Sequence, residues 1–220
     1  MSHLVKGSLA LGTAGTAAGG FYLGKELLGE KESKTIRQYL SDSGFQLISD
    51  LKEGEKEQWT EEFKSDKSKI KQLLGTSEDE DAKGGELLKG WCEARLKQGY
   101  SETNKDLDGV KNYCVMRTVA SQLLRAGKKV LNPEDTNNTK WEATYNKRKS
   151  TTTLSPKSQI AGLTGSWSDS QDTKNNDLPI IKSWCKSKTS GLFLAKDKDS
   201  VYTPVENWCT EDGAQVNQAQ

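Results

Sequence analysis

The chain has 220 residues, a formal net charge of +1 and a hydrophobic fraction of 33%, with 29% of its residues charged. This length suits one or two small domains. The low hydrophobic fraction limits each domain to a small core, in which aromatic side chains carry much of the burial. The net charge is nearly neutral, and the sequence lacks the basic stripe that a nucleic-acid-binding protein shows, so we expect no nucleic-acid partner.

Residues 1–30 are predicted to be a signal peptide or a membrane anchor. Residues 7–24 carry no charge, and a run of 18 residues is just long enough to cross a bilayer as a helix. Lys6 precedes this run, as in a secretory signal. Gly15 and Gly19 have the spacing that lets membrane helices approach closely. Because the run is rich in Gly and Ala and only weakly apolar, a cleaved signal and a disordered tail are alternatives to an uncleaved anchor.

Residues 31–116 are predicted to be mainly helical. Apolar spacing predicts a helix over 33–42 that Gly44 ends, and then a short extended piece at 45–48. Residues 55–74 are predicted to form one helix, with Trp59 in its apolar stripe. The acidic run at 77–81 lacks the alternating carboxylates of a calcium loop and is predicted to be a solvated loop.

Two further helices are predicted around the first two cysteines. One begins near residue 87 and carries Trp91 and Cys92. The other carries Tyr113 and Cys114 on one face, and its apolar pattern continues to Gly127. A single helix is therefore expected to join the first part of the chain to the second.

Residues 117–210 are predicted to repeat this plan with a longer middle. An extended piece at 128–131 precedes a helix that begins with Trp141. Residues 151–176 are rich in Ser, Thr, Asp, Lys and Gly and are predicted to be mostly loop. A helix over 180–186 follows, then short strands or loop anchors at 192–194 and 201–202. Residues 211–220 are predicted to be a polar tail.

The chain contains an internal duplication by sequence. Trp91-Cys92 matches Trp184-Cys185 at an offset of 93, and Cys114 matches Cys209 at an offset of 95. Trp59 matches Trp141 at an offset of 82. Upstream apolar positions, such as Leu40 and Leu123, match at an offset of 83. Because cysteine and apolar positions match while the polar residues between them differ, we interpret 31–116 and 117–210 as two copies that share a core.

Four cysteines are present, and each follows an aromatic residue directly. They lie two to a copy, which favours one disulfide within each copy, Cys92–Cys114 and Cys185–Cys209. Free buried cysteines and bridges between the copies are the alternatives. The matched aromatic residues are predicted to form the repeat core. They are Trp59, Trp91, Tyr113, Trp141, Trp184 and Trp208. A role for the tryptophans in stacking on carbohydrate or in partner binding is the alternative.

No catalytic, cofactor-binding or metal-binding motif is found. The paired cysteines are too far apart for a metal knuckle, and the only histidine is His3, within the N-terminal segment. Phosphate-binding loops and hydrolase motifs do not occur. We therefore expect a protein that is not an enzyme and that has no cofactor.

The Gly/Ala-rich start, the repeated Trp-Cys spacing and the terminal Trp208-Cys209-Thr210 resemble a large paralogous family of uncharacterised surface proteins in hemotropic mycoplasmas. The resemblance covers the whole chain, but its motifs are short. It implies a surface protein, antigenic or binding to a host-cell molecule, and it implies no catalytic residues. The function class that remains as an alternative is an enzyme or nutrient-binding protein whose site has no motif.

The expected location is the cell membrane, with a single span and the C-terminal part outside. Paired cysteines favour an oxidising compartment, and the N-terminal helix would contact the lipid bilayer. The lysines and arginines that follow the uncharged run, among them Lys25 and Arg37, favour the opposite orientation with a cytoplasmic C-terminal part. Secretion after cleavage is the second expectation.

Overall fold

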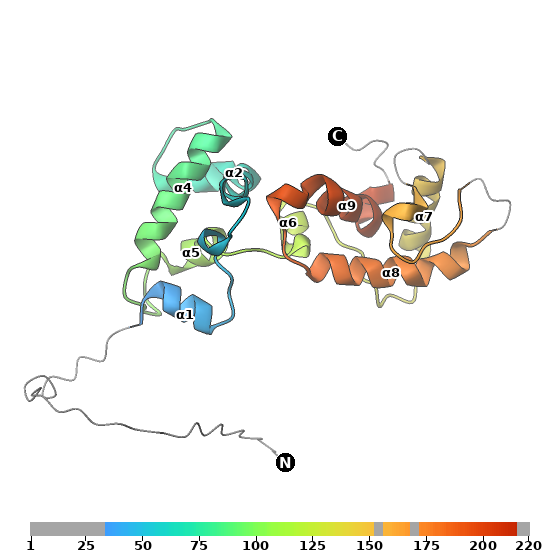
Figure 1. Ribbon diagram of the computed structural model, residues 1–220, viewed down its shortest axis with the longest axis horizontal. Helices are drawn as coiled ribbons and strands as arrows, with labels where there is room; N and C mark the ends of the chain where they lie inside the picture. Colours follow the sequence, from blue (N-terminus) through green and yellow to red (C-terminus); the bar gives the residue numbers. More distant parts are fainter. Residues whose placement is uncertain (1–33, 152–155, 168–171, 215–220) are drawn as a thin grey trace, which may run out of the picture. The chain divides into compact units, whose positions relative to one another are not determined.

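The computed structural model describes residues 34–151, 156–167 and 172–214, which are mainly α-helical (Figure 1). The predicted mainly helical class is confirmed. Within these ranges β-structure is limited to isolated bridges, so the extended pieces expected at 45–48, 128–131 and 192–194 contribute only single paired residues, namely Leu47, Val130 and Leu192. The expected signal peptide or anchor at 1–30 lies outside the described residues. In the part that is described, no helix has both the length and the hydropathy to cross a membrane.

Five helices precede the junction between the two parts of the chain, at residues 114–118. Local sequence accounts for the start of the first helix and the end of the third. They are α1 (Ile36–Asp42), α2 (Glu55–Ser65), α3 (Lys67–Leu74), α4 (Asp81–Leu96) and α5 (Leu107–Tyr113). Thr35 and Gln38 form a capping box at the start of α1. Gly75 follows α3 with a φ of 63°, the left-handed conformation in which glycine commonly ends a helix.

The single helix expected over 55–74 is wrong, because it is interrupted at Asp66. Asp66 has φ −147° and ψ 44°, which is not helical. Its carboxylate accepts a hydrogen bond of 2.9 Å from the hydroxyl of Tyr113, and Lys67 pairs with Asp81 at 2.5 Å. Contacts with α4 and α5 thus hold the two helices on either side of Asp66, and these contacts were not visible in the local periodicity.

Four helices follow the junction. They are α6 (Val119–Arg125), α7 (Thr139–Ser150), α8 (Lys174–Ser190) and α9 (Thr203–Cys209). The prediction that one helix runs from Cys114 to Gly127 is wrong: α5 ends at Tyr113, and Thr118 caps a new helix by accepting from the amide of Ser121. Residues 201–202 lie in a π-helical turn (Lys198–Tyr202) that leads into α9, not in a strand.

The same backbone hydrogen bonds occur at matched positions of the two parts. The amide of Ile36 donates to the carbonyl of Gln98, and that of Val119 donates to the carbonyl of Gly191. Likewise, the carbonyls of Cys114 and Cys209 accept from Ile48 and Leu131. The isolated bridges correspond in the same way, with Leu47 opposite Val115 and Val130 opposite Thr210. The two parts therefore share the same backbone pairings between segments that are distant in the sequence.

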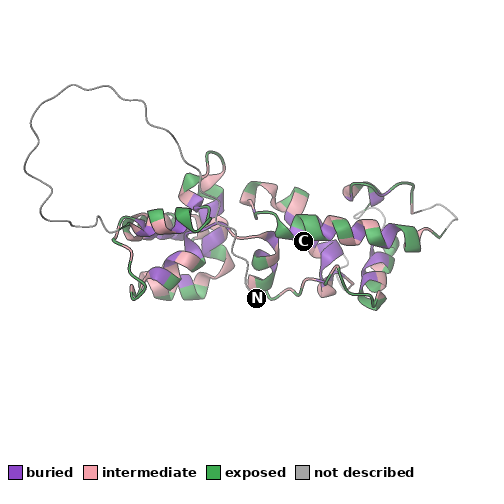
Figure 2. Cartoon of the chain, turned by 90° about the horizontal axis from the view of Figure 1, so that it is seen from below, coloured by how far each residue is buried: buried purple, intermediate pink, exposed green. Residues whose placement is uncertain are grey.

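Buried apolar residues form two clusters, and the division between them falls between Met116 and Val119. Figure 2 shows the buried residues on the faces that the helices turn toward one another, with exposed residues on their outer faces. In the first cluster α2 packs along α4, where Gly85 allows the backbone of α2 to approach. In the second, α7, α8 and α9 pack together. Each cluster holds one cysteine pair.

The insertion and the C-terminal segment are more ordered than the composition suggested. Within the expected loop at 151–176, Lys157–Gln159 forms a 3₁₀ turn, and Ile160 and Leu163 are buried in the second cluster. Residues Glu211–Ala214 form another 3₁₀ turn that packs on α7. The first four residues of the expected polar tail over 211–220 are therefore folded, and residues 215–220 lie outside the described range.

Candidate functional site

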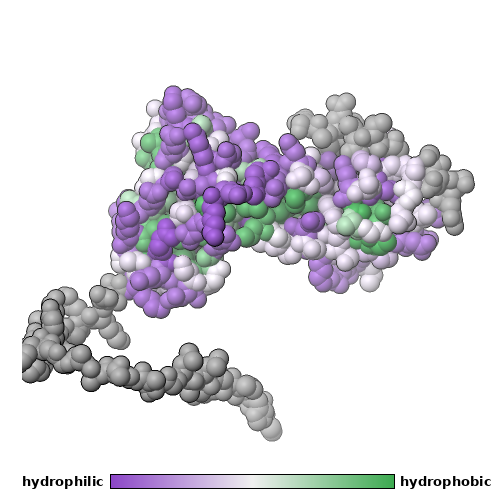
Figure 3. Space-filling model, viewed as in Figure 1, coloured by the Kyte–Doolittle hydropathy of each residue, from purple (hydrophilic) through white to green (hydrophobic). Residues whose placement is uncertain are grey.

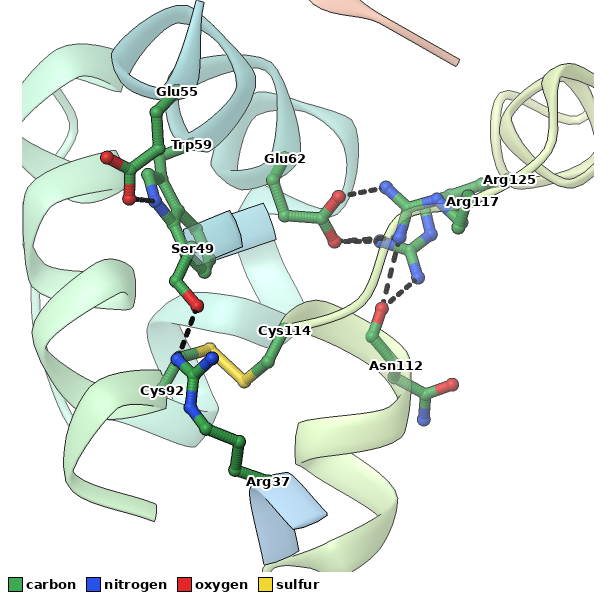
Figure 4. Close-up of a disulfide and its surroundings, with 10 residues drawn as sticks. All are labelled: Arg37, Ser49, Glu55, Trp59, Glu62, Cys92, Asn112, Cys114, Arg117 and Arg125. Carbon is green, nitrogen blue, oxygen red and sulfur yellow. Dashed lines mark hydrogen bonds and ion pairs between the residues drawn. A yellow bond between two sulfur atoms is a disulfide. The ribbon is translucent and has the colours of Figure 1, made fainter. Parts of the chain in front are cut away.

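The two predicted disulfides are present. Cys92 of α4 is bonded to Cys114 just after α5, and Cys185 of α8 is bonded to Cys209 at the end of α9. Both pairs have Cα atoms 5.6 Å apart, within the usual range for a disulfide. All four residues are fully buried, and Figure 4 shows the first bridge between its helices. Each bridge is a structural link inside one hydrophobic cluster.

The aromatic residues predicted as the repeat core are not equally buried. Trp59, Tyr113, Trp141 and Trp208 are buried. Trp91 and Trp184, which precede the cysteines on α4 and α8, are only partly buried and pack against the edges of the clusters. Trp91 and Trp184 are therefore corrected from core to edge positions, whereas Tyr113 and Trp208, which also directly precede a cysteine, are buried.

A buried charged cluster joins the two parts of the chain at their junction. Glu62 of α2 is 2% exposed and pairs with the guanidinium groups of Arg117 and Arg125, the second at 2.8 Å. Both arginines also donate to the carbonyl of Asn112, at 3.0 and 2.9 Å (Figure 4). One carboxylate thus fixes the linker residue Arg117 and the helix α6 against α2.

Burial and charge act in opposite directions on this cluster. Desolvation raises the pKa of Glu62, and the two arginines oppose that shift. Desolvation also lowers the pKa of Arg117, although Glu62 counters it. Burial, with a hydrogen bond to Asp66, raises the pKa of the neighbouring Tyr113 to about 12. At neutral pH the tyrosine therefore stays protonated, and its hydroxyl donates a hydrogen bond to the carboxylate of Asp66.

An open groove of about 710 Å³ lies beside this cluster. Its walls come from the loop after α1, the start of α3, the end of α5, the linker and α6. The cationic side chains in it are Lys69, Lys111, Arg117 and Arg125. Exposed apolar side chains line it as well: Phe45 is 41% exposed and Leu124 is 73% exposed. The groove therefore combines positive charge with exposed apolar surface.

A second buried polar network closes the insertion onto the C-terminal part. Lys157 Nζ lies 2.8 Å from Oδ2 of Asp177, and both side chains are more than nine-tenths buried. The hydroxyls of Tyr145 and Thr173 donate to the same oxygen, at 2.8 and 2.7 Å. Lys157 also lies 5.2 Å from the centre of the Trp167 ring.

This network holds Asp177 in its charged form. Desolvation alone would raise the pKa of Asp177, but hydrogen bonds from Lys157, Thr173 and Tyr145 together outweigh it and lower the pKa. Desolvation raises the pKa of Tyr145 to about 12. The four groups satisfy one another in the interior, so we interpret the network as an anchor for the insertion.

Neither charged cluster was recognised from the sequence. The partners of Glu62 lie 55 and 63 residues away, and no short motif connects such positions. Within the described ranges, no group of three or more His, Cys, Asp or Glu side chains is placed to hold a metal ion. No protein-family model, curated protein or solved structure matches this chain.

Proposed function

We propose that this chain is a membrane-anchored protein displayed outside the cell, without enzymatic activity, whose role is to contact a partner molecule or the host. The observation that carries the proposal is the pair of equivalent, fully buried disulfides. Stable disulfides are typical of proteins in oxidising environments and rare in the cytosol. The uncharged run at 7–24 supplies a candidate signal or anchor for reaching that environment.

The proposed architecture is an internal duplication of one helical unit. Its support is the correspondence of disulfides, capping threonines, backbone pairings and apolar clusters between residues 34–116 and 117–210. Trp59 and Trp141 are equally buried near the starts of α2 and α7. Since each copy closes its own core, its surface residues are free to differ.

The surface suits contact with other molecules in water. Figure 3 shows hydrophilic residues over much of the visible face, with hydrophobic residues gathered in smaller areas between them. Such a surface is consistent with the antigenic or host-binding role that the family resemblance implies. The junction groove favours binding of a partner over catalysis, because its lining offers charge and apolar contact and its one carboxylate, Asp66, is already paired.

Protease treatment of intact cells tests the proposed location. We expect brief treatment to remove the C-terminal part, detected with an antibody against residues 211–220, while a cytoplasmic marker protein stays intact. Survival of the full-length band on intact cells, with digestion only after lysis, would place the folded part inside and refute the proposal. Mass spectrometry of unreduced tryptic peptides from the same cells would test the disulfides separately.

A further inference from the structure

The junction groove carries more positive charge than its own acidic groups neutralise. Four cations surround it, namely Lys69, Lys111, Arg117 and Arg125, whereas the acidic groups that pair with them are Glu62 and Asp66. Two positive charges are left over from four cations and two carboxylates. Because a cleft with low-dielectric walls focuses such a field, this excess would attract a negatively charged partner.

The four cations have different parts in this arrangement. Arg117 and Arg125 are committed to Glu62 and the carbonyl of Asn112, so they contribute positive potential from a rigid position (Figure 4). Lys69 projects into solvent with 75% of its side chain exposed. Lys111 lies near the end of α5, and its Nζ is 5.4 Å from the centre of the Tyr39 ring. The two lysines are therefore the groups that a ligand would contact directly.

Apolar side chains at the groove define the rest of the ligand. Leu124 is the most exposed large apolar residue among the described residues, and Phe45 is also exposed. Val115 and Met116, which are mostly buried, also line the groove. When a partner's aliphatic side chain covers exposed leucine and phenylalanine side chains, apolar surface leaves water and the free energy of the complex falls. A ligand that carries only anionic groups would leave this apolar surface exposed to water.

We propose that the junction groove binds an acidic segment of a partner protein that carries apolar side chains between its carboxylates. This inference rests on the proposed function and names the chemistry of the partner. The groove volume of about 710 Å³ falls within the range of ligand sites in proteins. Two accessible lysines are fewer than the clusters that hold anionic membranes or sulfated glycans, and the aliphatic surface favours a peptide over a sugar.

The place in the second copy that matches Asp66 of this groove is built differently. Asp66 corresponds to Arg148, which is buried and donates to the carbonyl of Gly213 at 2.7 Å. The 3₁₀ turn of Glu211–Ala214 packs on α7 at this place, and Glu211 pairs with Lys140 at 2.5 Å. An acidic segment of the chain itself therefore lies against the second copy.

The test measures peptide binding to the purified full chain with both disulfides intact. The probe is a short fluorescent peptide in which Glu and Leu alternate, compared with peptides that alternate Lys with Leu and Glu with Ser. We expect saturable binding of the Glu/Leu peptide only, weakening as salt is added because exposed charges are screened. Binding is measured on purified protein, so its failure is distinct from a failure of the proposed location.

Variants locate the site. Lys69→Gln/Lys111→Gln should weaken binding by about fivefold to tenfold and reduce its salt dependence, and Leu124→Ser should weaken it without changing the salt dependence. Matched controls are Lys149→Gln/Lys188→Gln and Leu87→Ser, which alter exposed residues elsewhere. Lys69→Gln alone, at a highly exposed position, guards against a folding defect. Equal binding by the control and groove variants, or stronger binding to anionic vesicles or heparin than to the peptide, would overturn the proposal.

Discussion

The hydroxyl of Tyr145 donates a hydrogen bond of 2.8 Å to the carboxylate of Asp177. The positions that match these two by sequence in the first part of the chain, at offsets of 82 and 93, are Phe63 and Gly84. There the Phe63 ring occupies the space that a side chain at Gly84 would need. The two parts of the chain thus fill matched positions in two ways, with a buried hydrogen bond in the second part and a ring over a glycine in the first.

This packing predicts that Gly84→Ala destabilises the chain. An added Cβ would lie 2.2 Å from Cε1 of Phe63, and forcing the ring aside typically costs about 1–3 kcal/mol. Chemical denaturation followed by tryptophan fluorescence would measure the loss. A second replacement, Phe63→Leu, should reduce the penalty because it removes the ring atoms that clash.

Gly90→Ala is the matched control on the same helix. No atom lies within 4 Å of a Cβ at Gly90, so alanine should stabilise α4 by about 0.5–1 kcal/mol through its helix propensity. If the two alanine variants had equal stability, the close packing of Phe63 on Gly84 would be disproved.

Removing either disulfide should cost a similar amount of stability. The bridges close segments with sequence separations of 22 and 24 residues, and the chain-entropy model gives about 3 kcal/mol for loops of this size. Cys92→Ala/Cys114→Ala and Cys185→Ala/Cys209→Ala would be compared with the wild-type chain in urea. A neutral result for one pair alone would show that its part of the chain does not depend on its bridge.

The pattern of cysteines predicted these bridges because a disulfide joins two residues of one chemical type. Their spacing of 22 and 24 residues is nearly the same in the two parts of the chain, which favoured one of the three possible pairings. The charged clusters left no such trace. Glu, Asp, Lys and Arg make up 29% of the chain, so the pairing of Glu62 with Arg117 was one combination among very many. Only the folded chain brings these particular charges together out of water.

Errors in the helix boundaries have the same origin. The apolar periodicity continues through Asp66 and through residues 114–118, so it predicted unbroken helices there. The breaks come from distant partners: Tyr113 contacts Asp66, and Leu47 pairs with Val115. The insertion shows the reverse case. Its composition predicted a loop, whereas Ile160 and Leu163 within it are buried in the second cluster without any periodic signal.

Glu62→Gln should loosen the junction between the two parts. The glutamine would leave two arginines partly uncompensated in a buried site, which typically costs about 3–5 kcal/mol. Amide hydrogen exchange should accelerate first in α6, because Arg125 of that helix loses its charged partner. Peptide-level mass spectrometry would measure this exchange.

Glu86→Gln provides the comparison for that variant. Glu86 pairs with Lys56 at 3.6 Å, and both side chains are about two-thirds exposed or more. Such a surface pair contributes at most about 1 kcal/mol. Unchanged exchange in α6 of the Glu62 variant would show that the buried cluster does not hold the junction.

The pH dependence of stability should report on the Lys157–Asp177 pair. The folded state lowers the pKa of Asp177 below its ordinary value of 3.8, so the charged carboxylate stabilises the fold above that value. This contribution is lost as the pH falls through the lowered pKa, because the protonated acid no longer pairs with Lys157. Asp177→Asn should therefore be less stable than the wild-type chain at neutral pH, and the difference should shrink in acid.

Thermal unfolding at a series of pH values would measure that difference. Glu134→Gln is the control, since Glu134 pairs with Lys186 on the surface, where both side chains are about 70% exposed. Its effect should be small at every pH. Limited proteolysis adds a local readout: Asp177→Asn should expose the insertion to cleavage, because Lys157 holds it through this carboxylate. A stability difference that stays constant from neutral to acid pH would show that the charge of Asp177 does not hold the insertion.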